Sequence, residues 1–204
     1  MGVVRYRLTA AEEAMINTIC VYSSSSDAVA AEYVRAAVEL GRLIGERGME
    51  LVYGGANVGL MGTLARAAKN AGGRVTGVIP RAIAARGLAF GDADELVLTD
   101  TLRERKAVME ERAGTFIALP GGFGTLEETL EAITLKQLGI HDKPVVFVNT
   151  AGFYDGLLGL FERFYELDFA KAESRSLYHV APGPEEAMAY IETYSPVVFP
   201  EKWF

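Results

Sequence analysis

The sequence contains a single cysteine and fewer basic than acidic residues, and each shortage excludes a class of protein. The lone cysteine, Cys20, allows no disulfide within the chain, and its place in the apolar run INTICVY predicts a buried thiol rather than a nucleophile. At a formal net charge of -7, the chain lacks the basic face on which salt-dependent nucleic-acid binding depends. We therefore expect a reducing, cytoplasmic location and no nucleic-acid partner.

Long apolar runs and the common phosphate-binding signatures are also missing. No segment approaches the roughly 20 apolar residues that span a bilayer, and the opening MGVVRYRLTAAEEAM has no signal-peptide core, so no membrane partner is expected. The absence of a Gly-Lys-Ser/Thr loop and of G-x-G-x-x-G at the first predicted strand argues against ATP hydrolysis and nicotinamide redox chemistry. His141 and His179 lie in no Cys/His cluster, which favours a structural or solvated role over metal binding. No metal or organic cofactor is predicted.

What the sequence does contain is a regular alternation of short β-branched runs with longer helical patterns. Strands are expected at 16–22, 51–53, 74–79, 95–98, 115–119 and 144–148, and helices at 28–47, 60–71, 102–113, 126–138, 154–167 and 184–194. This alternation predicts right-handed βαβ units and a single-domain, Rossmann-like α/β fold, with a doubly wound parallel sheet covered by helices on both faces.

The same pattern sets the expected domain boundaries. The Rossmann-like domain is expected over residues 16–195, with an N-terminal extension at 1–15 and a C-terminal tail at 196–204. Residues 81–94 are expected to form a surface loop with one helical turn, and 169–184 an irregular segment with a short additional strand.

Two of the predicted strands end in a glycine pair, in the segments LVYGGANVGLMG and FIALPGGFGTLEE. Glycine permits positive φ and lets a ligand approach main-chain N–H groups, while the following helix contributes its positive dipole end. The candidate phosphate-binding residues are Gly54, Gly55, Gly121 and Gly122, joined by Ser23 directly after the first strand. Tight turns without a ligand are the alternative for the glycines, and capping of the next helix is the alternative for Ser23.

Glu128 has two competing interpretations. It follows Thr125 at the spacing of a helix capping box, in which the glutamate returns to the main-chain N–H of the cap residue. A phosphate seated on the same helix terminus would instead place this carboxylate close to the sugar that carries the phosphate. The first interpretation is structural and the second is catalytic.

Arg105 and Lys106 lie on one predicted helix stripe with Leu102, Met109 and Ala113. The planar fork of Arg105 suits bidentate binding of a phosphate or carboxylate, and the stripe makes Met109 a candidate substrate contact. A solvated charged face is the alternative for both cations. Truncation of Arg105 is expected to weaken nucleotide processing far more than the fold, because a surface-facing arginine contributes little to stability.

These motifs resemble those of the LONELY GUY (LOG) proteins, which are cytokinin riboside 5′-monophosphate phosphoribohydrolases. The resemblance rests on P-G-G-x-G-T-x-x-E at Pro120–Glu128, on the preceding Arg105–Lys106 pair, and on YGGANVGLMG, GVIP and QLGIHDKPV, and it covers about residues 16–167. It implies a Rossmann-like homodimer that hydrolyses the N-glycosidic bond of a nucleoside 5′-monophosphate to free base and ribose 5-phosphate, without a cofactor. Such sequences have also been called lysine decarboxylases, but nothing in this one indicates a pyridoxal phosphate site.

By motif, Arg105 and Glu128 correspond to the catalytic arginine and glutamate of the family. The substrate-binding positions that the resemblance implies are Lys106, Gly122, Gly124, Thr125 and Thr134. Two positions depart from the family pattern: no carboxylate lies near Gly87, where the family commonly has a glutamate, and Leu102 and Arg103 replace the usual Met and His.

The predicted partner is therefore a small purine nucleoside 5′-monophosphate, with cytokinin nucleotides and AMP as first candidates. A nucleotide-binding or carrier protein without catalytic activity, on the same fold, is the alternative.

Overall fold

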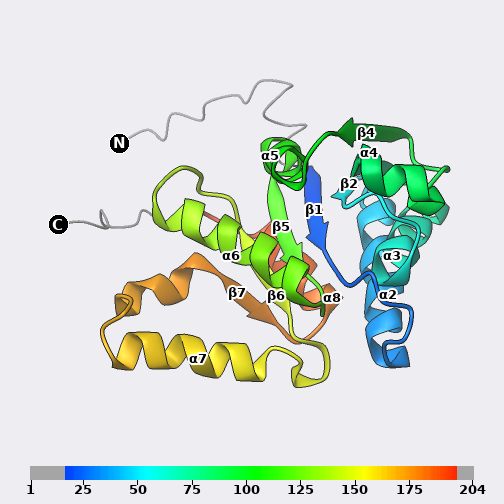
Figure 1. Cartoon of the computed structure of the whole chain (residues 1–204). Coiled ribbons are helices and arrows are strands. Elements are labelled where there is room, and N and C mark those ends of the chain that lie inside the picture. Colours follow the sequence, from blue (N-terminus) through cyan, green and yellow to red (C-terminus); the bar gives the residue numbers. More distant parts are fainter. Residues whose placement is uncertain (1–16, 197–204) are drawn as a thin grey trace, which may run out of the picture.

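Seven strands form one parallel sheet in the order β4-β3-β2-β1-β5-β6-β7 (Figure 1). The computed structural model describes residues 17–196. The strands are β1 (Thr18–Tyr22), β2 (Glu50–Tyr53), β3 (Arg74–Pro80), β4 (Glu95–Thr99), β5 (Thr115–Ala118), β6 (Val145–Val148) and β7 (His179–Ala181). From β1 the chain builds outward to β4 on one side and then from β5 to β7 on the other. The strand order thus reverses between β1 and β5, which confirms the predicted doubly wound fold.

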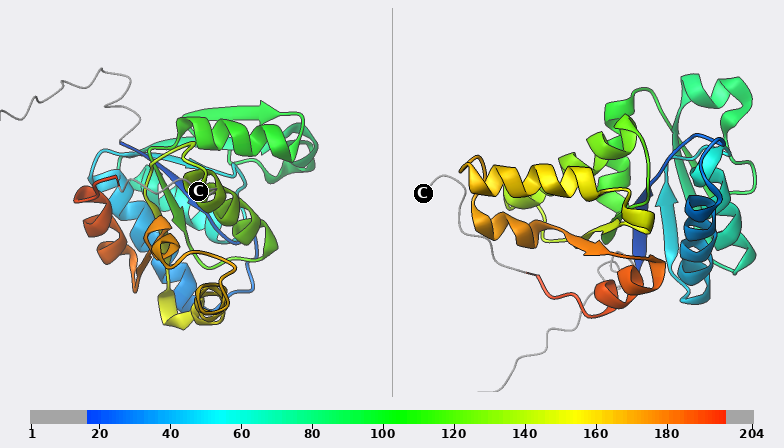
Figure 2. Two further views of the ribbon diagram at one scale, coloured as in Figure 1. Left: turned by 90° about the vertical axis from the view of Figure 1, so that its left-hand side faces the viewer. Right: turned by 90° about the horizontal axis from the view of Figure 1, so that it is seen from below.

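Helices cover both faces of the sheet (Figures 1 and 2). They are α2 (Ala31–Glu46), α3 (Gly59–Asn70), α4 (Arg81–Ile83), α5 (Leu102–Arg112), α6 (Phe123–Gln137), α7 (Asp155–Glu166) and α8 (Pro184–Glu192), with short helical turns η1 (Ala84–Leu88), η2 (Thr150–Gly152) and η3 (Ala172–Leu177).

The two faces follow from the period of two along each strand. On β1, Ile19 and Val21 pack in the cluster formed with α2, α3 and α8, whereas Cys20 and Tyr22 pack in the cluster that contains residues of α5 and α6. Strands buried on both sides read as continuous apolar runs, which is why these segments were recognisable. Cys20 is fully buried and its thiol is free, as predicted, and burial raises its pKa.

Three segments differ in detail from the sequence-based prediction. Helix α6 begins at Phe123 rather than near residue 126, so the bare glycine loop is shorter than expected. Residues 81–94 contain α4 followed by the π-helical turn η1, and the additional strand predicted within 169–184 is β7. Residues 1–16 and 197–204 lie outside the described part of the chain, so the terminal extensions stay predictions.

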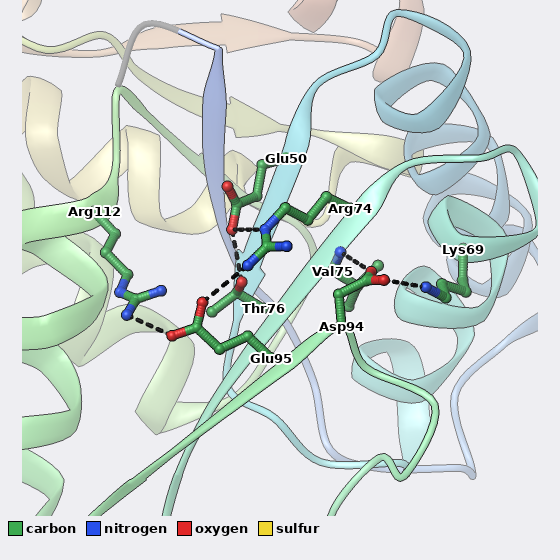
Figure 3. A network of polar contacts seen from close by, with 8 residues as sticks. All are labelled: Glu50, Lys69, Arg74, Val75, Thr76, Asp94, Glu95 and Arg112. Carbon is green, nitrogen blue, oxygen red and sulfur yellow. Dashed lines mark hydrogen bonds and ion pairs between the residues drawn. The ribbon is translucent and has the colours of Figure 1, made fainter. Parts of the chain in front are cut away.

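A network of polar contacts lies at the amino ends of β2, β3 and β4 (Figure 3). Its members are Glu50, Lys69, Arg74, Thr76, Asp94, Glu95 and Arg112, together with the main-chain N–H of Val75. Arg74 bridges Glu50 and Glu95 at 3.4 and 3.1 Å, and a hydrogen bond from Arg112 lowers the pKa of Glu95. Opposite charges therefore satisfy one another at this edge of the sheet, which is remote from both glycine loops.

The histidine at the end of the α6 connection has a structural role. The Nε2 atom of His141 lies 2.9 Å from the carbonyl of Ala132, its Nδ1 atom accepts from the N–H of Lys143, and burial lowers its pKa to about 4. In the part of the chain that the structure describes, no helix has both the length and the apolar character to cross a membrane.

Candidate active site

A buried ion pair joins α5 to α6 at the carboxyl edge of the sheet. The Nη1 atom of Arg105 donates to Oε1 of Glu128 at 2.6 Å, with only 13% and 9% of the two side chains exposed. The Nε–H of Arg105 donates to the carbonyl of Val78 on β3 at 3.0 Å. The interpretation of Arg105 as part of a solvated face is therefore wrong. The expected low stability cost of its truncation assumed a surface-facing arginine, and the buried pair makes a larger cost the expectation.

The capping-box interpretation of Glu128 is also wrong. The N-cap of α6 is Gly122, with no side-chain cap, so Thr125 lies inside the first helical turn. Burial raises the pKa of the Glu128 carboxyl above its ordinary value, and the adjacent Arg105 offsets part of this effect. Its second oxygen, Oε2, has no hydrogen-bond partner among residues 17–196.

The space that Arg105 occupies exists because residue 54 is glycine. A Cβ atom at Gly54 would lie 2.1 Å from Nη2 of Arg105, closer than any real contact. Gly55 follows with a φ of 73°, and its Cα lies 2.8 Å from the position that a Cβ on Gly77 would take. The first glycine pair thus seats the arginine and lets β2 and β3 approach one another.

Lys106 is held by two glutamates of α6. Its Nζ atom contacts Oε1 of Glu127 and lies 2.7 Å from Oε2 of Glu131. Although burial by itself lowers the pKa of Lys106, the hydrogen bonds to these carboxylates raise it overall. The ammonium therefore stays charged beside the Arg105–Glu128 pair.

The two glycine loops differ in which main-chain N–H groups are free. At the start of α3, the N–H of Gly59 donates to Oδ1 of Asp27 at 2.8 Å, and those of Leu60 and Met61 both donate to the carbonyl of Ser24. This helix terminus is already occupied by the loop that follows β1. Nothing in the sequence around Asp27 indicates this long-range contact.

The start of α6 is different. No described residue accepts a hydrogen bond from the N–H groups of Phe123, Gly124 or Thr125. A Cβ on Gly122 or Gly124 would meet nothing within 4 Å, so a ligand can approach the main chain there. These are the conditions under which a helix N-terminus binds an anion.

Ser23 adds a side-chain group next to this terminus. The N–H of Leu119, just before the loop, donates to the carbonyl of Tyr22, which places the end of β1 beside the loop. Ser23 exposes 8% of its surface, and its hydroxyl has no partner among the described residues. The alternative role of Ser23 as a helix cap is wrong, because the N-cap of α2 is Ala30 and has no side-chain cap.

The remaining predicted residues lie in three different environments. The side chain of Thr125 is buried against Gly121, where a Cβ would lie 2.1 Å from the threonine Oγ1. Met109 is fully buried in the core beneath α5. Thr134 is exposed, and its hydroxyl donates to the carbonyl of Leu130 in its own helix. The structure therefore does not bring Thr134 to the Arg105–Glu128 pair of the same chain.

Across residues 17–196, no three His, Cys, Asp or Glu side chains are arranged to hold a metal ion. The site offers two sets of groups. Its free main-chain N–H donors suit an anion, and a carboxylate and a guanidinium lie about one helical turn away from them. Such a site is typical of Rossmann-like proteins that bind nucleotides at the switch point of the sheet, and this is the class to which the fold and the site point.

The chain belongs to the LONELY GUY (LOG) family, as its motifs indicated. The family described as "Possible lysine decarboxylase" matches residues 61–191. A probable cytokinin riboside 5′-monophosphate phosphoribohydrolase, LOGL2 of Oryza sativa subsp. japonica, is 41% identical over 96% of this chain and 84% of its own. The cytokinin riboside 5′-monophosphate phosphoribohydrolase LOG2 of Arabidopsis thaliana is 41% identical over 87% of this chain and 84% of its own.

Solved structures share the fold. The molybdenum cofactor binding protein of Rippkaea orientalis superposes with a TM-score of 0.67 at 26% identity, over 86% of this chain and 95% of that one. The molybdenum cofactor carrier protein of Chlamydomonas reinhardtii gives a TM-score of 0.65 at 26% identity, over 86% and 95%.

The space that Gly54 leaves for the Arg105 side chain leads to a prediction. We expect Gly54→Ala to displace the guanidinium and leave Glu128 without its partner, which lowers the free energy of unfolding by about 2 kcal/mol or more in urea titrations. In a background that already carries Arg105→Ala, the same substitution should cost much less, because the remaining close atom is Sδ of Met61, 2.9 Å from the Cβ position at the end of a flexible side chain.

Gly91→Ala is the matched control, since a Cβ there meets nothing within 4 Å. Equal stabilities of the Gly54→Ala and Gly91→Ala variants, or an undiminished Gly54→Ala effect without Arg105, would contradict this account.

Proposed function

We propose that this protein hydrolyses the N-glycosidic bond of a purine nucleoside 5′-monophosphate, releasing the free base and ribose 5-phosphate. The names of relatives at 41% identity support this activity. The observation that carries the proposal is the buried Arg105–Glu128 pair. Its glutamate keeps one carboxylate oxygen without a described partner, on the helix whose first N–H groups also have none.

The phosphate end of the nucleotide is assigned to the second glycine loop. The N–H groups of Phe123, Gly124 and Thr125 supply donors, Gly121 and Gly122 allow close approach, and the dipole of α6 favours the negative charge. The orphaned hydroxyl of Ser23 is a further donor. On this proposal Gly54 and Gly55 act indirectly, by seating Arg105, and Met109 acts by packing α5 against the sheet.

The sugar and the base are assigned to the Arg105–Glu128 pair. Cleavage develops positive charge at C1′ and negative charge on the departing base. The free Oε2 of Glu128 stabilises the first and orients or deprotonates a water molecule. Arg105 holds the Glu128 carboxylate in place and supplies positive charge near the leaving base, and Lys106 adds a second positive charge on the same helix.

Assay of purified protein with AMP and with isopentenyladenosine 5′-monophosphate tests the activity. We expect free base by chromatography from at least one of them, no release from adenosine because it lacks the phosphate, and no effect of a chelator. Binding without cleavage would also be informative, because the fold resembles that of molybdenum cofactor carriers. Tight binding without turnover across a nucleotide panel would instead identify a carrier.

Glu128→Gln separates catalysis from structure. Glutamine keeps the shape and can still accept from Arg105, but it lacks the negative charge needed opposite C1′. We expect turnover to fall by about 10²-fold or more while the protein stays folded, at reduced stability because Arg105 loses its counter-ion, and binds nucleotide.

The control is Glu127→Gln, which removes a neighbouring exposed carboxylate and should change turnover by less than about threefold, because Glu131 still holds Lys106. Since burial raises the pKa of Glu128, the loss of wild-type turnover on acidification should begin above the ordinary value of about 4.3. Near-wild-type release of base by Glu128→Gln would eliminate the assignment.

A homodimer is part of the proposal, and α6 supports it. Thr134 lies six residues after Glu128, so the two side chains point about 120° apart around the helix axis. Thr134 shares an exposed stripe with Phe123, Leu130 and Leu138, and Phe123 is 94% exposed. If Thr134 contacts substrate, as the family resemblance implies, then a second copy packs on this stripe and Thr134 reaches the site of that copy.

Leu130→Glu should then yield monomers in analytical ultracentrifugation and lower turnover at least about tenfold, because a charge in an apolar interface is costly. Leu160→Glu, on the exposed face of α7, is the control and should leave the dimer intact. A wild type that is monomeric at all concentrations and fully active would refute the shared site. The cytoplasm stays the predicted compartment, which cell fractionation checks.

A further inference from the structure

The second glycine loop has little in its own sequence to hold it in place. Pro120 has no N–H, three of the next four residues are glycine, and the N-cap Gly122 has no side-chain cap. Glycine loses more conformational freedom on ordering than any other residue. Contacts from outside the loop must therefore fix the direction in which its N–H groups point.

Leu119, immediately before the loop, is held from two sides. Its N–H donates to the carbonyl of Tyr22 on β1 at 3.0 Å. Its carbonyl accepts from the hydroxyl of Tyr154 at 2.6 Å, a contact that spans 35 residues and comes from the start of α7. Leu119 is fully buried, so water does not compete for either bond.

Tyr154 is itself rigidly placed. It is 1% exposed, and its ring meets those of Phe147 and Phe153 edge-on, each at a centroid distance of 4.9 Å. Its N–H donates to Oδ1 of Asn149 at 2.7 Å, directly after β6. Burial raises the pKa of the phenol, so the hydroxyl keeps its proton and remains a donor.

We propose that Tyr154 is a positioning residue for the phosphate end of the substrate. Its hydroxyl fixes the carbonyl of Leu119, and through it the entry of the chain into the glycine loop and the aim of the free N–H groups of α6. Tyr154 touches no substrate itself. This inference rests on the proposed function. It adds to it a residue outside the family motif, which comes from the segment between β6 and α7.

Tyr154→Phe tests the role, because it keeps the ring contacts and leaves the buried Leu119 carbonyl without its donor. We expect KM for AMP to rise about tenfold with kcat within about twofold, the pattern of binding lost equally from the ground state and the transition state. Affinity for inorganic phosphate should fall by a similar factor, while adenosine binding should not change. Hydrogen exchange of the amides at 121–125 should become faster.

Tyr178→Phe is the matched control. It removes a hydroxyl from the same aromatic cluster, where Tyr178 bonds Tyr165 at 3.2 Å and meets the ring of Phe147, but it does not contact Leu119. KM, phosphate affinity and exchange at 121–125 should stay at wild-type values in this variant.

Equal effects of the two substitutions, a fall in melting temperature alone for Tyr154→Phe, or a wild type without affinity for phosphate would each overturn the positioning role. If the wild type binds phosphate but cleaves no nucleotide, the proposed function fails, and weaker phosphate binding by Tyr154→Phe still supports the role of Tyr154.

Discussion

The site depends on one buried ion pair between two helices. Arg105 and Glu128 meet at 2.6 Å with little solvent contact, and either charge would be costly in that position without the other. The pair requires α5 to return from the edge strand β4 over the sheet. Met109 holds α5 against the sheet, because it is buried in the same core cluster as Cys20 of β1. It also requires residue 54 to lack a side chain, since no Cβ fits beside the guanidinium.

Two loops with nearly the same glycine pattern serve opposite purposes. The loop after β2 is closed by the loop after β1, because the carboxylate of Asp27 and the carbonyl of Ser24 accept hydrogen bonds from the first N–H groups of α3. The loop after β5 keeps its N–H groups free of described partners and has open space at Gly122 and Gly124. One loop therefore builds the wall of the site, and the other is available to an anion.

The two edges of the sheet are divided in the same way. At the amino edge, charges such as Arg74, Glu95 and Arg112 pair with one another among the described residues (Figure 3). At the carboxyl edge, the free oxygen of Glu128 and the hydroxyl of Ser23 lack partners among the described residues. The same fold serves proteins described as carriers of molybdenum cofactor, so function follows from these side chains and not from the fold.

The sequence by itself determined the sheet and its order of elements, because strands buried on both faces and amphipathic helices leave periodic patterns along the chain. It also indicated the family, through motifs such as the one at Pro120–Glu128. It also singled out Arg105 and Glu128 as residue types at a family spacing. It could not show that they bond each other, that Asp27 closes the first loop across 32 residues, or that Tyr154 reaches Leu119. Only the tertiary structure decided these points, since each is a contact between elements far apart in the chain, and the burial that makes it strong exists only after the elements have packed.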